Sequence, residues 1–206
     1  MEAKNRVDNP LVRTDTAMYM LWPEGRSTPD AHPIPAGYNL LTIPSENMDK
    51  VRPLVEKDGA LTDAAWRQFL CSVVPGGMFV VREQTSFSLV GTISAVHNPA
   101  ATRFYFPGGG ELGYLFVAPE HRRKGLGFAL IVAAVRRLHQ GGYRNIFLGV
   151  QGWRLPAIQA YLRAGFRPFI HAQELLPRWR SVFAAMGWET HEAEWPTCLA
   201  PTRDLR

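Results

Sequence analysis

An apolar strand, a basic turn with two glycines and a long apolar helix follow one another between Glu111 and Gly142. Residues 111–117 are apolar without clean alternation, which predicts a strand buried on both faces. Apolar residues at helical spacing begin after Gly125 and end at Gly141-Gly142, a typical helix stop. This succession requires a sheet with at least one helix packed on it, and so predicts an α/β fold.

The rest of the chain supplies further strands and helices for such a layered fold. We expect strands at 18–22, 37–43, 78–82, 88–96, 111–117, 145–150 and 166–170. We expect helices from an N-cap at Ser45 to Gly59, from an N-cap at Thr62 to Pro75, from Pro156 to Gly165, and over 177–186. The order of these elements predicts a mixed sheet flanked by helices.

The turn at Arg122-Arg123-Lys124-Gly125-Leu126-Gly127 has the composition of an anion site. Glycines let the main chain approach a ligand closely, and the first N–H groups of a helix point at an anion. Three cations at a helix start are unfavourable unless a bound anion compensates them. Residues 112–180 as a whole carry a net charge of +9. Nucleic acid is a rival ligand, but no nucleic-acid motif is present and we rank it last.

A second motif runs from Arg154 to Phe166. On a helix, Arg154, Ala157 and Tyr161 share one stripe, so that stripe can face a ligand while Ile158 points to the core. Spacing alone leaves two readings of Tyr161 open. It is either a residue that meets the ligand or a packing tyrosine with a local hydrogen bond.

Together the two motifs resemble the core of the GNAT acetyltransferases. The strings that carry the resemblance are Leu115-Phe116-Val117-Ala118-Pro119-Glu120-His121, then Arg122-x-x-Gly125-x-Gly127, then Ala157-Ile158-x-x-Tyr161-x-x-x-Gly165-Phe166. The resemblance implies a GNAT fold, an α+β structure whose mixed, mostly antiparallel sheet splays between its fourth and fifth strands. It also implies acetyl-CoA as co-substrate and an amine acceptor, either a small molecule or a peptide.

The resemblance also implies roles for individual residues. The main chain of Phe116 and Val117 would bind the pantetheine arm, and the amides of residues 123–128 (Arg123, Lys124, Gly125, Leu126, Gly127 and Phe128) would hold the pyrophosphate. The N–H near Leu115 would stabilise the oxyanion, and Tyr161 would protonate the leaving thiolate. Arg154 stands where many members have Asn, so we expect it to reach the phosphates of the cofactor.

Glu111 is our candidate general base because it opens the central strand, eleven residues before Arg122. The alternative is a solvated carboxylate at a strand end. The expected reaction is the direct attack of a neutral amine on the thioester in a ternary complex. The competing function is a sensor with a GNAT fold that binds acetyl-CoA without turnover.

Other features of the sequence bound its setting. No apolar run has the length of a membrane span or a signal peptide, and Cys71 and Cys198 have no metal or redox spacing, so we expect a cytoplasmic protein. The six histidines are scattered, so we expect no metal. We expect an N-terminal arm at 1–36, the acetyltransferase domain at 37–170, and at 171–206 an extension that packs on the domain or forms a homodimer surface.

Overall fold

The computed structural model describes residues 18–59, 61–97, 106 and 108–197. Two compact units form within the chain. The first unit is Glu24–Leu148, and the second combines the segment up to Pro23 with the chain from Gly149 onward.

The first unit is built on a mixed sheet. Its strands lie in the order β2 (Tyr38–Thr42), β3 (Val73–Glu83), β4 (Leu89–Val96), β5 (Gly110–Val117) and β6 (Ile146–Val150), the last of which begins in this unit. The pairs β2–β3, β3–β4 and β4–β5 are antiparallel, whereas β5–β6 is parallel. The predicted α+β fold with a mixed, mostly antiparallel sheet is therefore confirmed.

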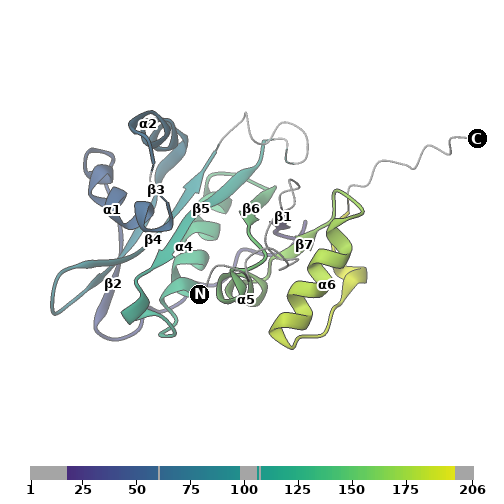
Figure 1. Ribbon diagram of the computed structural model, residues 1–206. Helices are drawn as coiled ribbons and strands as arrows, with labels where there is room; N and C mark the ends of the chain where they lie inside the picture. Colours follow the sequence, from purple (N-terminus) through teal and green to yellow (C-terminus); the bar gives the residue numbers. More distant parts are fainter. Residues whose placement is uncertain (1–17, 60, 98–105, 107, 198–206) are drawn as a thin grey trace, which may run out of the picture. The chain divides into compact units, whose positions relative to one another are not determined.

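One face of this sheet is covered by the helices between β2 and β3. They are η1 (Ser45–Val51), α1 (Arg52–Val55), η2 (Glu56–Asp58) and α2 (Asp63–Ser72) (Figure 1). Met78 and Val80 of β3 share a buried cluster with Trp66 and Phe69 of α2. Because strand residues alternate between faces, Phe79 points to the opposite side, where it lines a cavity together with residues of α4 (Leu126–Gln140).

The start of α2 was predicted correctly and the start of the preceding helix was not. Thr62 accepts a hydrogen bond from the Ala65 N–H at 3.1 Å, as expected of an N-cap. Ser45 is not the N-cap, because Pro44 holds that position and no side chain of the described residues caps this helix start. The segment forms short 3₁₀ and α turns instead of one helix, since Pro53 lacks the N–H that would continue the helix into its interior.

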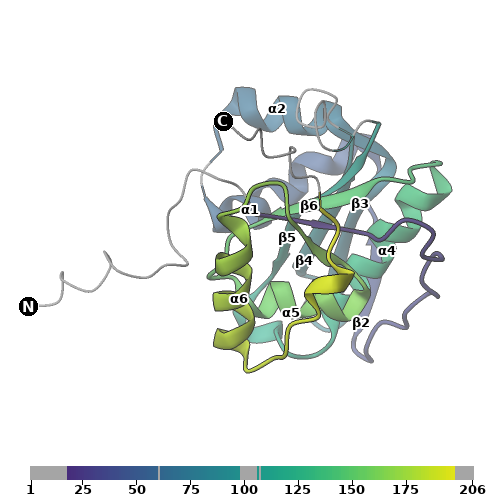
Figure 2. The ribbon, with the colours of Figure 1, turned by 90° about the vertical axis from the view of Figure 1, so that its right-hand side faces the viewer.

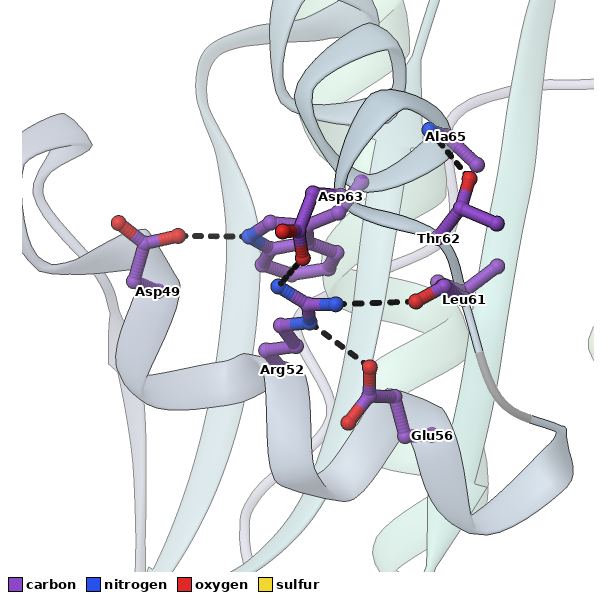
Figure 3. A network of polar contacts seen from close by, with 8 residues as sticks. Asp49, Arg52, Glu56, Leu61, Thr62, Asp63 and Ala65 are labelled. Atoms are coloured by element: carbon purple, nitrogen blue, oxygen red, sulfur yellow. Dashed lines mark hydrogen bonds and ion pairs between the residues drawn. The ribbon is translucent and has the colours of Figure 1, made fainter.

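Arg52 ties this segment to α2 (Figure 3). Its guanidinium donates to Glu56 Oε1 at 2.7 Å, to Asp63 Oδ1 at 2.7 Å and to the Leu61 carbonyl at 2.9 Å. Beside it, the buried Trp66 indole donates to Asp49 Oδ1 at 2.6 Å. These contacts hold α2 against the turns that precede it.

The segment from Glu24 to Gly37 lies along α4 on the other side of the sheet, and we call it the strap (Figure 2). Arg136 of α4 donates to the Pro29 carbonyl at 2.7 Å, and the His32 ring meets the Phe128 ring edge-on at 4.7 Å. Pro35 lies beside Gly125: a Cβ atom added to Gly125 would be 3.8 Å from the Cγ atom of Pro35. The strap is thus packed along α4 within the first unit.

The second unit pairs β1 (Met18–Leu21) with β7 (Arg167–Phe169) in antiparallel fashion. It also contains α5 (Leu155–Ala164), α6 (Leu175–Met186) and the short η4 (Glu192–Glu194). On α6, Trp179 and Phe183 pack against Trp195, so the chain after α6 folds back and covers the apolar side of that helix.

No helix in the part of the chain that the structure describes has both the length and the hydropathy needed to cross a bilayer.

Candidate functional site

The basic turn before α4 has the backbone of an anion site. Gly125 is the N-cap of α4 and adopts a left-handed conformation (φ 83°), and Arg123 does the same (φ 59°). Such turns bring successive main-chain N–H groups to one side. Among the described residues no side chain caps α4, and its first hydrogen bond runs from the Ala129 N–H to the Gly125 carbonyl. The N–H groups of residues 126–128 therefore have no partner inside the helix.

The three basic side chains of the turn have different surroundings. Arg122 Nε donates to the Val117 carbonyl at 2.8 Å, and Lys124 Nζ donates to the Tyr38 hydroxyl at 2.9 Å. The Tyr38 hydrogen bond raises the pKa of Lys124. The exposed Arg123 makes no hydrogen bond or ion pair with the described residues. All three cations are exposed; Arg122 and Lys124 keep further N–H donors for an anion, and Arg123 keeps all of its own.

A β-bulge interrupts β5 next to this turn. Thr92 of β4 is opposite Phe116 and Ser94 is opposite Gly113, so Ile93 faces two residues of β5, Tyr114 and Leu115. Tyr114 adopts a left-handed φ of 53°, which is uncommon outside glycine. A bulge leaves one residue outside the ladder and so frees main-chain polar groups at this point. Leu115, the sequence-predicted oxyanion residue, lies at this bulge.

β5 and β6 separate after two residue pairs. Their register records Gly110 opposite Ile146 and Glu111 opposite Phe147, and in the described chain no further pair joins the two strands. The main chain of β5 from Leu112 to Val117 is therefore without a ladder partner on the β6 side. Phe116 and Val117 lie on this open stretch, and the Val117 carbonyl keeps one lone pair after it accepts from Arg122.

Glu111 faces the side of the sheet that α1 and α2 cover, because it is opposite Val96, a member of the cluster there. Burial raises the pKa of its carboxyl from 4.5 to about 7, and no cation among the described residues offsets this shift. Burial and the charge of Glu111 also raise the pKa of the Tyr114 phenol, whose ring meets Phe69 of α2 edge-on at 4.6 Å. A carboxyl that titrates near neutrality beside a half-exposed phenol is suited to accept a proton.

Phe116 lies on the same side of the sheet, with two cations near its ring. The Lys57 ammonium of η2 is 5.8 Å from the ring centroid, and the Arg122 guanidinium is 6.0 Å away. Positive charge therefore gathers at the end of β5 nearer the basic turn, whereas the carboxyl of Glu111 lies at the other end.

The remaining predicted residues belong to the second unit. Arg154 is the N-cap of α5, and its guanidinium lies 4.7 Å from the ring of the exposed Trp153. Ala157 is partly buried, whereas Tyr161 is buried with its ring edge-on to Phe166 at 6.0 Å. In the structure, Tyr161 is therefore buried on α5 together with Ile158, whereas the sequence predicted that the two side chains lie on different stripes of the helix.

In the described residues, no group of three or more His, Cys, Asp or Glu side chains is arranged to hold a metal ion. Cys71 is a free, exposed thiol, and Cys198 lies outside the described residues.

Comparison with known proteins agrees with this geometry. Residues 41–166 match the model of the acetyltransferase (GNAT) family. The chain belongs to the GNAT acetyltransferase family. The matched residues include the basic turn, the bulged strand and α5, so both motifs that carried the resemblance fall within the family domain.

Individual relatives of this GNAT protein are distant. A 71-residue stretch is 38% identical to the mycothiol acetyltransferase of Saccharomonospora viridis. This match covers 34% of this chain and 23% of that protein. A GCN5-related N-acetyltransferase from Sphaerobacter thermophilus superimposes with a TM-score of 0.58 at 23% identity, over 74% of this chain and 48% of that one. A putative GNAT acetyltransferase from Novosphingobium aromaticivorans superimposes with a TM-score of 0.53 at 19% identity, and the match covers 74% of this chain and 59% of that one. The chain thus spans about half the length of these solved structures, and they support the fold alone.

Sequence reasoning about this GNAT protein missed two tyrosines. Tyr38 comes from an edge strand 83 residues before His121, and nothing in its local sequence connects it to the basic turn. Tyr114 sits in an apolar run that gives no sign of a bulge, because a left-handed φ at a tyrosine carries no sequence signal.

Proposed function

We propose that this protein is an N-acetyltransferase that moves the acetyl group of acetyl-CoA to a primary amine. The observation that carries the proposal is the start of α4, with its left-handed turn, its uncapped N–H groups and its basic side chains. This arrangement suits a diphosphate, which is the anionic group of coenzyme A nearest its reactive arm. The open edge of β5 suits an arm that carries amide groups, such as pantetheine, because it offers main-chain donors and acceptors.

The proposed step is direct. The amine nitrogen attacks the thioester carbonyl carbon, a C–N bond forms, and the C–S bond breaks to release the CoA thiolate. The oxyanion needs a donor fixed in advance, and a main-chain N–H at the bulge near Leu115 supplies it in our proposal. The amine loses its proton to Glu111, directly or through one water. In this proposal Tyr161 returns a proton to the thiolate, a role that rests on the family resemblance.

The pKa of Glu111 bears on the class of acceptor. A lysine-type amine is neutral in only about one molecule in 2,500 at pH 7, which costs about 4.6 kcal/mol, whereas an α-amine costs about 1 kcal/mol. A base with a pKa of about 7 is closely matched to an amine with a pKa near 8. The proposed acceptor is a primary amine on either a small molecule or a peptide, and a less basic amine costs less to deprotonate.

We also propose a cytoplasmic protein with an N-terminal arm at 1–36, an acetyltransferase domain at 37–170 and a C-terminal extension at 171–206.

One experiment separates catalysis from mere binding. The protein is titrated with acetyl-CoA by calorimetry, then incubated with acetyl-CoA, a panel of amines and a thiol-reactive dye. Release of free CoA that depends on the amine supports the proposal. Binding without release under any acceptor favours the sensor, and no uptake of acetyl-CoA or CoA refutes both.

A further inference from the structure

Tyr38 connects two residues of the turn that begins α4. Its ring is buried, with 7% of its surface exposed, and its hydroxyl lies 2.9 Å from His121 Nδ1 and 2.9 Å from Lys124 Nζ. The His121 ring is edge-on to the Tyr38 ring, and the Lys124 ammonium lies 5.5 Å from the centroid of that ring. Both ends of the segment His121–Lys124 are thus held by one side chain from β2.

The inventory of protons fixes the direction of these hydrogen bonds. An ammonium can only donate, so the Tyr38 oxygen accepts from Lys124. The phenolic proton then needs an acceptor, and His121 Nδ1 is the atom within hydrogen-bond distance. His121 Nδ1 accepts only if it carries no proton, which places the proton of the neutral imidazole on Nε2. The opposite direction would leave a buried phenolic proton without an acceptor among the described residues, which is costly.

Residues of the β3–β4 hairpin fix where Tyr38 lies. Tyr38 is opposite Glu83 in the β2–β3 ladder, and Glu83 Oε1 lies 3.8 Å from His121 Nδ1, farther than the tyrosine hydroxyl. Glu83 is itself oriented by Ser86, whose hydroxyl donates to Oε2 at 2.7 Å. Gln84 donates to the Tyr38 carbonyl at 3.4 Å and to Asn39 Oδ1 at 3.1 Å. The position of Tyr38 is therefore set by the β3–β4 hairpin and not by the turn it holds.

We propose that Tyr38 is a positioning residue for the diphosphate of the donor, acting through a hydrogen-bond chain from Lys124 through the Tyr38 hydroxyl to His121. The chain holds the turn 121–125 in the conformation that directs its N–H groups to one side, before any ligand arrives. The inference rests on the proposed function for the identity of the anion. The direction of the hydrogen bonds does not depend on the proposed function, because it follows from the donors and acceptors alone.

The test compares donors with and without the diphosphate. For Tyr38→Phe we expect the KM for acetyl-CoA to rise about fivefold, which corresponds to the loss of two modest hydrogen bonds, with kcat nearly unchanged. The KM for S-acetyl-pantetheine, which lacks the diphosphate, should not change. Tyr143→Phe is the matched control, because it removes a hydroxyl beyond the opposite end of α4 and should change neither constant.

Two outcomes would overturn the inference. One is a KM that stays constant for both donors or rises equally for both. The other is an Nδ1–H tautomer of His121 in the wild type, read from the imidazole ¹⁵N shifts. If Tyr38→Phe fails to fold, His121→Leu removes the other partner of the hydroxyl and should give the same donor-selective rise. Failure of the wild type to take up acetyl-CoA would refute the proposed function, whereas the tautomer measurement still decides the hydrogen-bond chain.

Discussion

Glu111→Gln should stabilise the fold in a pH-dependent way. Below pH 4.5 the carboxyl is protonated in both the folded and the unfolded chain, so its burial has no pH-linked cost. As pH rises from 4.5 towards 7, the unfolded chain ionises while the folded one stays protonated, because burial raises the pKa to about 7. Above pH 7 the carboxylate must be buried with its charge, and the full cost is present.

The magnitude follows from the two pKa values. The difference between 4.5 and about 7 corresponds to about 3 kcal/mol, at about 1.4 kcal/mol for each pKa unit. Glutamine has nearly the same shape and no charge. The free energy of unfolding of Glu111→Gln should therefore exceed that of the wild type by about 3 kcal/mol at pH 8 and by almost nothing at pH 4.

Urea denaturation at pH 4, 5, 6, 7 and 8 measures this difference. The exposed Glu189→Gln serves as the control and should change stability by less than about 0.5 kcal/mol at every pH. A Glu111→Gln difference that is the same at all pH values would refute the reasoning, because it would mean that the carboxyl titrates alike in both states. If Glu111 is also the base, turnover of the stabilised variant should fall about 10²-fold, and the wild-type turnover divided by that of the variant should grow as pH passes 7, because the wild-type base ionises there.

Three further variants test other parts of the structure. Asp49→Ala should lower the free energy of unfolding by about 1 kcal/mol in urea denaturation, because the buried indole N–H of Trp66 loses its acceptor; Asp49→Asn, which keeps an acceptor, should recover most of this loss. Tyr161→Phe should lower kcat while calorimetry finds the acetyl-CoA affinity unchanged, and equal losses in both would mean that Tyr161 only packs. Arg123→Gln should raise the KM for acetyl-CoA several-fold at low salt and little at 0.5 M salt, because salt screens an exposed cation. The exposed Arg144→Gln is its control and should show neither effect.

The sequence predicted the elements whose cause is local. Gly125 marks the start of α4 because a left-handed turn there favours glycine, and the apolar spacing beyond it is that of a buried helix. Thr62 was recognised as an N-cap because the hydrogen bond it makes lies within one turn of the chain. Ser45 was the wrong cap because Pro44 and Pro53, either side of it, dictate where the turns begin.

Features that depend on distant residues could not be predicted in this way. The pKa of Glu111 reflects how deeply the fold buries the carboxyl, which its place at a strand end does not reveal. Nothing in the local sequence indicated that the ammonium of Lys124, one of the three cations of the basic turn, donates to Tyr38, 86 residues away in the chain. Tyr161 was placed on a stripe apart from Ile158, but both are buried, because a helix turned into a core buries more than one row of side chains.

The strap has a consequence for how this protein is shortened. Residues 41–166 match the family domain, so a boundary at residue 41 is the natural choice for an expression clone. Such a cut would remove Ala31, His32 and Leu40 from the cavity that they line with Phe79, Ala129 and Val132. The exposed apolar surface would then favour self-association of the shortened protein. A boundary before Met18 keeps this cover in place, retains β1 for its pairing with β7 and leaves the hydrogen bond between Arg136 and Pro29 intact.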